Sequence, residues 1–220
     1  MNVFAVRLLS ILVGYAFGLF QTAYFVGKAH GVDIRTLGSG NAGTTNALRN
    51  FGKRAGLIVF CGDVLKSVFA ALCVYLIFES QFPDIIRLLC VYAGAGAMLG
   101  HCFPIYMEFR GGKGVACLGG LVIAFSWQLA ILGIAVFLGL IAITHYVSLG
   151  SLLGSLSFFV GTLVMGQMGL FGMPAAALIE MYTVIFLLVA LVWFQHRSNI
   201  VRLISGNERK TYLFSTREKK

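Results

Sequence analysis

"LVIAFSWQLAILGIAVFLGLIAIT", residues 121–144, is the stretch of this chain that decides the fold. It lies within a nearly uncharged apolar stretch from about residue 114 to 195, and other apolar segments lie near 3–26, 55–78 and 85–107. Apolar runs of about 20 residues are long enough to cross the roughly 30 Å hydrocarbon layer of a bilayer. The chain is 59% hydrophobic and 11% charged, which is unlike a soluble domain. The sequence therefore predicts an all-α integral membrane protein, with residues 1–220 forming one multi-span domain.

The basic residues predict how this domain is oriented in the membrane. The chain carries 17 Lys and Arg against 8 Asp and Glu, and the cations gather near 28–54, near 108–113 and in the tail 196–220. Cytoplasmic loops of membrane proteins carry an excess of Lys and Arg. We therefore expect these three segments to be cytoplasmic, the amino terminus to be outside and the carboxyl terminus to be inside.

The number of spans follows from this orientation. A chain that leaves the cytoplasm near residue 112 and returns near 196 must cross an even number of times. Four crossings fit, near 114–126, 129–145, 149–168 and 175–195. The total is then seven spans, of which 114–126 is short and must be tilted or surrounded by protein. Five spans are the alternative.

A first polar cluster interrupts the apolar pattern at "TLGSGNAGTTNALRNFGK", residues 36–53. The glycines at 38, 40 and 43 permit positive φ, so that consecutive amides can form a concave anion site. Arg49 adds a planar fork that suits two phosphate oxygens. A flexible cytoplasmic loop is the alternative. The candidate phosphate-binding residues are Gly38, Ser39, Gly40, Asn41, Thr44, Asn46 and Arg49.

A second polar cluster is "GHCFPIYMEFRGGKGVA", residues 100–116. Pro104 should end the preceding helix. Beyond it, Lys113 is flanked by Gly111, Gly112 and Gly114, so little side-chain bulk separates its charge from a bound anion. The apolar segment that follows begins a helix, and helix amino termini favour anions. A basic stop signal at the membrane boundary is the alternative.

A third polar cluster is "QHRSNIVRLISGNE", residues 195–208. His196, Asn199 and Arg202 are spaced by three residues and share one face if the helix continues. A basic belt that binds anionic lipid headgroups is the alternative. Inside the span 55–78, Asp63 and Lys66 have the spacing of a salt bridge, and we expect a structural pair that faces the bundle interior.

Taken together, "GSGNAGTTNALR", "GHCFPIYMEFRGGKGVA" and "HRSNIVRLISGNE" resemble the three motifs of the bacterial acyl-phosphate:glycerol-3-phosphate acyltransferases, the PlsY type. The resemblance covers essentially the whole chain. It implies a multi-pass enzyme of the bacterial inner membrane that transfers a fatty acyl group from acyl phosphate to the 1-hydroxyl of glycerol 3-phosphate, the first step of phospholipid synthesis. It implies no metal and no cofactor, and a soluble acyl-phosphate synthase as the source of the donor.

The resemblance also implies roles for individual residues. Ser39, Asn41, Arg49 and Lys113 would hold phosphate groups, while His196 and Asn199 would orient the glycerol phosphate; Ser39, Lys113, His196 and Asn199 are the candidate catalytic residues. The base stays open between His196 and a phosphate of the substrate. No histidine of the chain has an aspartate in H-x4-D spacing, which argues against the acyl-thioester-using acyltransferases.

Two other classes of protein compete with this interpretation. A small transporter of an organic or phosphate anion is the main alternative, but it should carry polar groups through the midplane from both sides. A CDP-alcohol phosphotransferase would need several aspartates for metal, and this chain has only Asp33, Asp63 and Asp84, widely spread. We expect no nucleic-acid partner, since the basic residues are accounted for by membrane topology and phosphate binding.

Overall fold

A computed structural model describes residues 2–212, and within them the chain forms helices and no strands. The end of the predicted cytoplasmic tail, residues 213–220, lies outside the described residues. The longer helices are α1 (Val3–Gly18), α3 (Thr44–Phe78), α4 (Ile86–Cys102), α6 (Trp127–Thr144), α7 (Val147–Gln167) and α8 (Ala175–Gln195). The shorter elements are α2 (Thr22–Ala29), η1 (Ile34–Thr36), η2 (Pro83–Ile85), η3 (Ile105–Met107), α5 (Val115–Phe125) and α9 (Arg197–Ile204).

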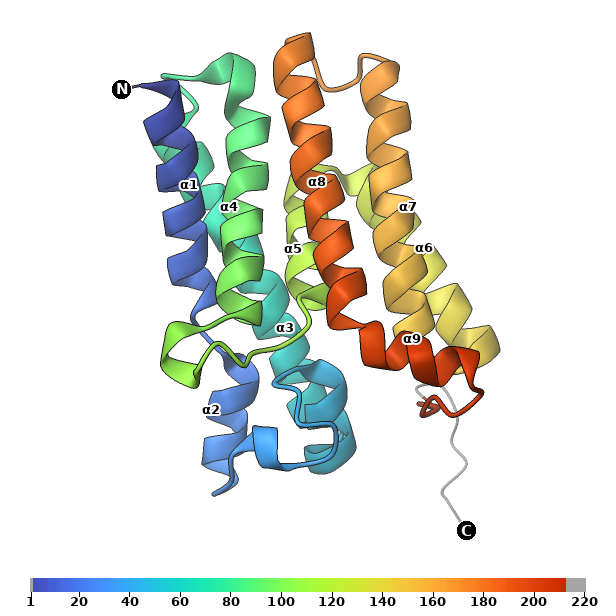
Figure 1. The fold of residues 1–220 in the computed structure, drawn as a ribbon. Helices are drawn as coiled ribbons and strands as arrows, with labels where there is room; N and C mark the ends of the chain where they lie inside the picture. Colours follow the sequence, from blue (N-terminus) through green and yellow to red (C-terminus); the bar gives the residue numbers. More distant parts are fainter. Residues whose placement is uncertain (1, 213–220) are drawn as a thin grey trace.

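The helices form a bundle with two unlike ends (Figure 1). We call the end that carries α2, η1, the segment 103–114 and α9 the polar end. The amino terminus lies at the opposite end, together with the connections α3–α4 and α7–α8. All three polar clusters of the sequence thus lie at one end of the molecule, as predicted.

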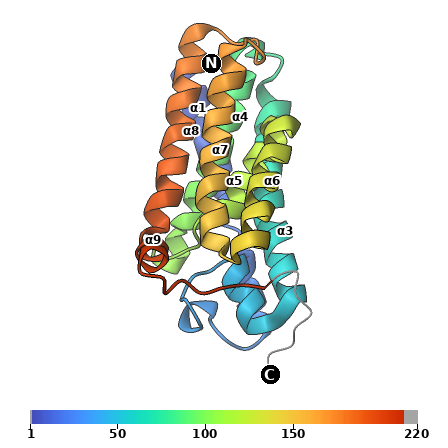
Figure 2. The same cartoon turned by 90° about the vertical axis from the view of Figure 1, so that its right-hand side faces the viewer.

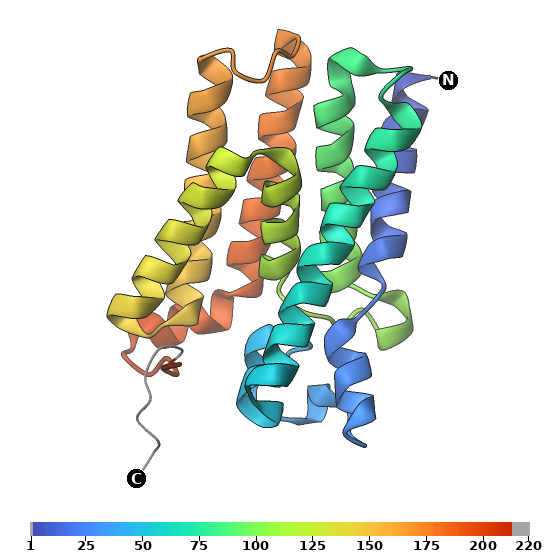
Figure 3. The same cartoon turned by 180° about the vertical axis from the view of Figure 1, so that it is seen from behind.

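Among residues 2–212, six helical segments are long and apolar enough to cross a membrane, and α5 is a shorter apolar helix. The turn between α5 and α6, at Ser126, lies part-way along the bundle rather than at either end (Figure 3). Seven helical segments therefore run along the bundle, and the prediction that 114–126 is short is confirmed. The five-span alternative is wrong, because four helices lie between residues 114 and 195.

The first predicted span, 3–26, is confirmed as an apolar segment long enough to cross a membrane, but it consists of two helices. The chain leaves helical geometry after Gly18 and begins α2 at Thr22. The buried amide of Gln21 fills this break, because its Nε2 donates to the carbonyls of Gly18, Gly100 and His101 at 3.0–3.2 Å. A side chain thus supplies hydrogen bonds to carbonyls at the ends of two helices, which an apolar residue could not do.

Glycines bring α1 and α4 into close contact. A methyl group built on Gly14 of α1 would lie 1.9 Å from the Ala93 carbonyl oxygen of α4, and one on Gly96 would lie 2.1 Å from the Ile11 carbonyl oxygen. Small residues at helix crossings allow such backbone approach in membranes. The small residues of "GAGAMLG", residues 94–100, thus belong to this packing face.

The largest apolar cluster lies where α4, α5 and α8 meet, around Met98, Leu121 and Ile185. Many large apolar side chains point away from it and stay exposed, such as Leu76 and Ile143. An apolar exterior of this extent suits a chain surrounded by lipid.

Candidate active site

The first motif forms a turn that leads into α3. Gly38 and Gly40 adopt positive φ, +58° and +71°, as predicted, so that residues with a side chain would be strained there. Gly43 does not, because its φ of −160° is extended backbone before the first residue of α3, Thr44. The predicted loop therefore ends at residue 43, and residues 44–51 are helical up to a break at Gly52.

Asn46 holds this turn together with its side chain. Its Oδ1 accepts from the backbone N–H of Ser39 at 3.1 Å, and its Nδ2 donates to the carbonyls of Ile34 and Leu37. Both the oxygen and the nitrogen of the Asn46 amide are therefore hydrogen-bonded to the backbone, and neither is free to bind phosphate. Ser39 itself is exposed, and the Thr44 hydroxyl is buried without a hydrogen-bond partner among the described residues.

The second motif begins where α4 ends. α4 stops at Cys102 and Pro104 opens η3, as predicted from the proline. The N–H groups of Gly111 and Gly112 donate to the carbonyls of Cys102 and His101, both at 3.1 Å. These two amides are therefore unavailable to an anion. Gly114, with φ of +82°, is the N-cap of α5.

The first two motifs are joined at the polar end. Arg35, which forms an ion pair with Asp33 at 2.7 Å, donates from NH1 to the Met107 carbonyl. A methyl group on Gly112 would lie 2.7 Å from the Ala42 carbonyl oxygen, so the two loops also touch there. Each loop thus supports the position of the other.

The third motif does not continue α8 as a straight helix. α8 ends at Gln195, and α9 begins at Arg197 after a change of direction at His196 (Figure 1). Asn199 and Arg202 project from α9. Asn199 is buried, and its Oδ1 accepts a hydrogen bond from the Lys113 ammonium, which joins the second and third motifs.

Glu208 was not predicted as a site residue. Its carboxylate accepts from Asn199 Nδ2 at 2.7 Å, from Arg202 Nε at 2.8 Å and from the hydroxyl of Ser148 at 3.0 Å. Burial raises the pKa of Glu208, but these hydrogen bonds outweigh it and hold the pKa below its usual value. The only feature of the sequence that could have drawn attention to Glu208 is that it is an acidic residue in a basic tail. Its contact with Ser148 on α7 cannot be seen in the sequence pattern.

The segment after α9 crosses the polar end toward α3 (Figure 2). Arg49 donates from NH2 to the Thr211 hydroxyl at 2.6 Å and to the Arg209 carbonyl at 3.1 Å, while Thr211 N–H donates to the His145 carbonyl. The fork of Arg49 is thus directed at the third motif and its extension.

A pocket of about 380 Å³ lies between the second and third motifs. Gly111, Gly112 and Lys113 line one side, Asn41 from the first motif joins them, and the end of α8 and the start of α9 form the other side. Aromatic rings also contribute to the lining, so that charged and apolar surfaces meet in one cavity. A molecule with an anionic head and an apolar part suits such a lining.

Lys113 has an altered acidity in this site. Burial lowers the pKa of Lys113 to about 8; Glu208 opposes this shift, and Arg202, Arg49 and Arg197 add to it. These cations give the site an excess of positive charge, which an anionic ligand would relieve.

His196 is buried, and its protonation state follows from its contacts. Nδ1 lies 2.8 Å from the Val192 carbonyl oxygen, and a carbonyl can only accept, so Nδ1 carries the proton and Nε2 is a free acceptor. Burial, with a smaller contribution from the charge of Lys113, lowers the pKa of His196 to about 4 against the opposing effects of Val192 and Glu208. The ring is therefore neutral at physiological pH.

The predicted site residues thus divide into two groups. Arg49, Lys113, His196, Asn199 and Arg202 come together at the polar end, as the electrostatic and hydrogen-bond contacts above require. Asn46, Gly111 and Gly112 lie nearby, but their polar groups are used to hold the loops. The substrate-binding roles of these residues stay predictions.

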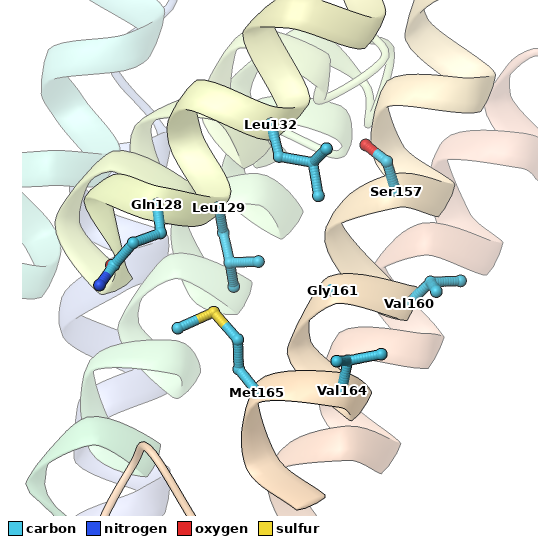
Figure 4. A pocket seen from close by; sticks show the side chains of 8 residues that line it. All are labelled: Gln128, Leu129, Leu132, Ser157, Val160, Gly161, Val164 and Met165. Carbon is cyan, nitrogen blue, oxygen red and sulfur yellow. The ribbon is translucent and has the colours of Figure 1, made fainter. Parts of the chain in front are cut away.

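A second cleft, of about 390 Å³, lies between α6 and α7 (Figure 4). Leu129 and Leu132 of α6 line it together with Val160, Val164 and Met165 of α7, and its surface is almost wholly apolar. It contains none of the predicted site residues.

Comparison with known proteins agrees with this geometry. The family model described as glycerol-3-phosphate acyltransferase matches residues 8–206. The chain belongs to this family. It is therefore a membrane-bound acyltransferase, and the resemblance seen in its three motifs is confirmed.

Individual members of the glycerol-3-phosphate acyltransferase family align along nearly the whole chain. The family member of Clostridioides difficile is 41% identical and covers 96% of this chain and 97% of its own length; that of Thermosipho melanesiensis is 38% identical, with 92% and 91% covered. Two crystal structures of PlsY (YgiH), an integral membrane glycerol 3-phosphate acyltransferase, are also similar. The glycerol 3-phosphate form has a TM-score of 0.80 at 33% identity, covering 95% of this chain and 99% of that one. The lysophosphatidic acid form has 0.78 at 32%, with 94% and 95% covered.

Proposed function

We propose that this acyltransferase moves a fatty acyl group from acyl phosphate to the 1-hydroxyl of glycerol 3-phosphate. The products are lysophosphatidic acid and inorganic phosphate. The observation that carries the proposal is the convergence of Lys113, Asn199, His196 and Arg49 at one end of a membrane bundle of this family. The ligands in the two PlsY structures, glycerol 3-phosphate and lysophosphatidic acid, are the acceptor and product of the same reaction.

Cations of the site have the chemistry to bind both phosphate groups. Lys113 and Arg49 lie close enough to interact, and each is a strong hydrogen-bond donor to phosphate oxygens. Ser39 and Asn41, on the loop that touches Gly112, add neutral donors. In this proposal Arg202 holds Glu208 in place, and so fixes Asn199 rather than binding phosphate directly.

The reaction itself needs alignment more than activation. The oxygen of the 1-hydroxyl attacks the acyl carbonyl carbon, the bond from that carbon to the phosphate oxygen breaks, and phosphate leaves with the electron pair. The hydroxyl proton must leave at the same time. Cations around the leaving phosphate stabilise the charge that develops there, and the pocket holds hydroxyl and carbonyl side by side.

His196 orients the hydroxyl in this proposal, and a phosphate oxygen takes its proton. Nε2 of His196 is a free acceptor, which suits a hydrogen bond from a glycerol hydroxyl. With a pKa of about 4, His196 is a weak base at neutral pH. A phosphate, whose second pKa is near 6, is a stronger base and accepts the hydroxyl proton more readily. Of the two bases that the sequence left open, the substrate phosphate is therefore favoured.

The polar end faces the cytoplasm in this proposal, and the membrane is the bacterial inner membrane. Both substrates then reach the site from the side on which soluble enzymes work. A soluble acyl-phosphate synthase is the expected source of the donor, as the resemblance implies. The acyl tail lies among the helices while its head enters the polar pocket.

An assay of the purified protein tests the proposal. Wild-type protein in detergent is given glycerol 3-phosphate and one donor at a time: acyl phosphate, acyl-CoA or acyl carrier protein. We expect lysophosphatidic acid only from acyl phosphate, with one phosphate released per product. If lysophosphatidic acid formed from a thioester but not from acyl phosphate, acyl phosphate would be refuted as the donor. Uptake of glycerol 3-phosphate into proteoliposomes without acyl transfer would instead support a transporter.

A further inference from the structure

A triad of ionisable side chains is buried between α3 and α4, outside the site described above. It consists of Asp63 and Lys66 on α3 and His101 on α4, each at most 4% exposed. The Lys66 ammonium lies 2.9 Å from Asp63 Oδ1, as the sequence predicted, and 2.8 Å from His101 Nδ1. It also donates to the Phe20 carbonyl at the break between α1 and α2. Buried charges of this kind are costly and call for an explanation.

The contact with Lys66 fixes the state of the His101 ring. An ammonium group has only donors, so Nδ1 must accept and the ring proton lies on Nε2. The Nε2 edge of the ring faces the second motif. A methyl group built on Gly112 would lie 2.0 Å from Nε2, so the ring is packed directly against the α-carbon of Gly112.

His101 holds the same loop through its backbone. Its carbonyl accepts from Gly112 N–H at 3.1 Å, and a methyl group on Gly111 would lie 1.9 Å from that carbonyl oxygen. The ring and the carbonyl of one residue thus contact two consecutive glycines. The next residue in the chain is Lys113, whose ammonium reaches Asn199.

We propose that Asp63, Lys66 and His101 are positioning residues that set the reach of Lys113 into the phosphate site. Lys66 locks the orientation of the His101 ring, Asp63 compensates the charge of Lys66, and the ring holds the glycines that precede Lys113. None of the three touches substrate. The inference rests on the proposed function in one respect, that Lys113 binds a phosphate group.

The test removes the triad's charges as a pair, since an unpaired buried charge would unfold the protein. The first variant is the double substitution Asp63→Asn and Lys66→Met. The second is His101→Asn, which keeps an acceptor near Nδ1 for Lys66 but deletes the ring edge against Gly112. The matched control is Arg7→Met with Glu180→Gln, which removes an ion pair that joins α1 to α8 with an N–O distance of 2.5 Å.

Two measurements separate positioning from stability. The first is steady-state kinetics, which gives the KM for glycerol 3-phosphate and kcat separately. The second is the pH dependence of Lys113 labelling by an amine-acylating reagent, followed by mass spectrometry. In the wild-type protein, the midpoint of this labelling should lie near the Lys113 pKa of about 8. Both triad variants should raise KM by about tenfold or more. They should also move the labelling midpoint up toward the ordinary lysine value, because a displaced Lys113 becomes more solvated, while the control should change neither.

Each other outcome counts against the proposal. It is overturned if both triad variants keep the wild-type KM and labelling midpoint, or if the control shifts both as much. Failure of both triad variants to fold also overturns it, because the triad would then serve the fold alone. Labelling needs no acyl donor, so a shifted midpoint in a protein that does not use acyl phosphate would sustain the positioning role and reject the proposed function.

Discussion

Lys113 illustrates how one residue can be prepared for a charged ligand. It is partly buried among other cations, and burial brings its pKa to about 8, while Asn199 accepts its hydrogen bond. An arriving phosphate restores the charged form by pairing with it. In the proposed reaction, Lys113 therefore serves to bind phosphate rather than to transfer a proton.

Binding of glycerol 3-phosphate should weaken above pH 8. Below the pKa of about 8, Lys113 is an ammonium that attracts phosphate, and above it the charge is lost. The KM should rise about twofold from pH 7 to 8 and about fivefold from pH 8 to 9, as a single titration near pH 8 requires. Initial rates across this range measure it. Lys113→Arg is the control, since arginine stays charged; an equal rise in both proteins would assign the effect to another group.

His196→Asn should lower kcat about 10- to 100-fold without changing the shape of the pH–rate profile between pH 5.5 and 8. Asparagine can still donate to the Val192 carbonyl, but the free Nε2 acceptor is lost. Because the pKa of His196 is about 4, the ring does not titrate in this range. Rate profiles of the two proteins, measured side by side, decide the point. An inflection in the wild type that disappears in the variant would make His196 the base.

At the scale of single elements, close helix packing should be sensitive to added volume. Gly96→Ala places a methyl group 2.1 Å from the Ile11 carbonyl oxygen, so α1 and α4 must separate. We expect a loss of about 1–3 kcal/mol, seen as a lower Tm in detergent. Gly139→Ala on α6, where a methyl group meets nothing within 4 Å, is the control and should be neutral or slightly stabilising. Equal Tm values in the two variants would contradict this packing argument.

Element boundaries show what a sequence can and cannot predict. α4 ended before Pro104 as expected, and successive helices meet near the predicted limits of the crossings 114–126, 129–145, 149–168 and 175–195, because prolines and polar residues act locally. The break between Gly18 and Thr22 was missed, since it depends on Gln21 reaching carbonyls of α4. Contacts between distant segments leave no local pattern.

The candidate site follows the same rule. Arg49 and Lys113 could be singled out from composition and spacing, because cations beside glycines and amides are unusual in an apolar chain. The role proposed for His196 came from the resemblance of the third motif. Glu208 could not be predicted, since its role depends on α9 turning back toward Ser148 on α7. His101 belongs to the second motif but was not singled out, because only the structure brings it against Gly112.

At the scale of the whole molecule, the two ends of the bundle should be accessible from opposite sides of the membrane. Ser205, after α9, and Gln81, between α3 and α4, are exposed at opposite ends. In a background where the five free cysteines are replaced, Ser205→Cys and Gln81→Cys would each carry one thiol. In inside-out inner-membrane vesicles, an impermeant maleimide should label the first and spare the second. If only Gln81→Cys were labelled, the protein would have the orientation opposite to the one proposed.

The gathering of every motif at the polar end has a consequence for the bilayer. In the proposed reaction, each lysophosphatidic acid molecule enters the monolayer at the polar end of the bundle, beside the helices that contact its acyl tail. One monolayer therefore gains area with every turnover while its partner gains none. Balanced growth of such a membrane then depends on lipid translocation, a step that acyl transfer at one face does not supply.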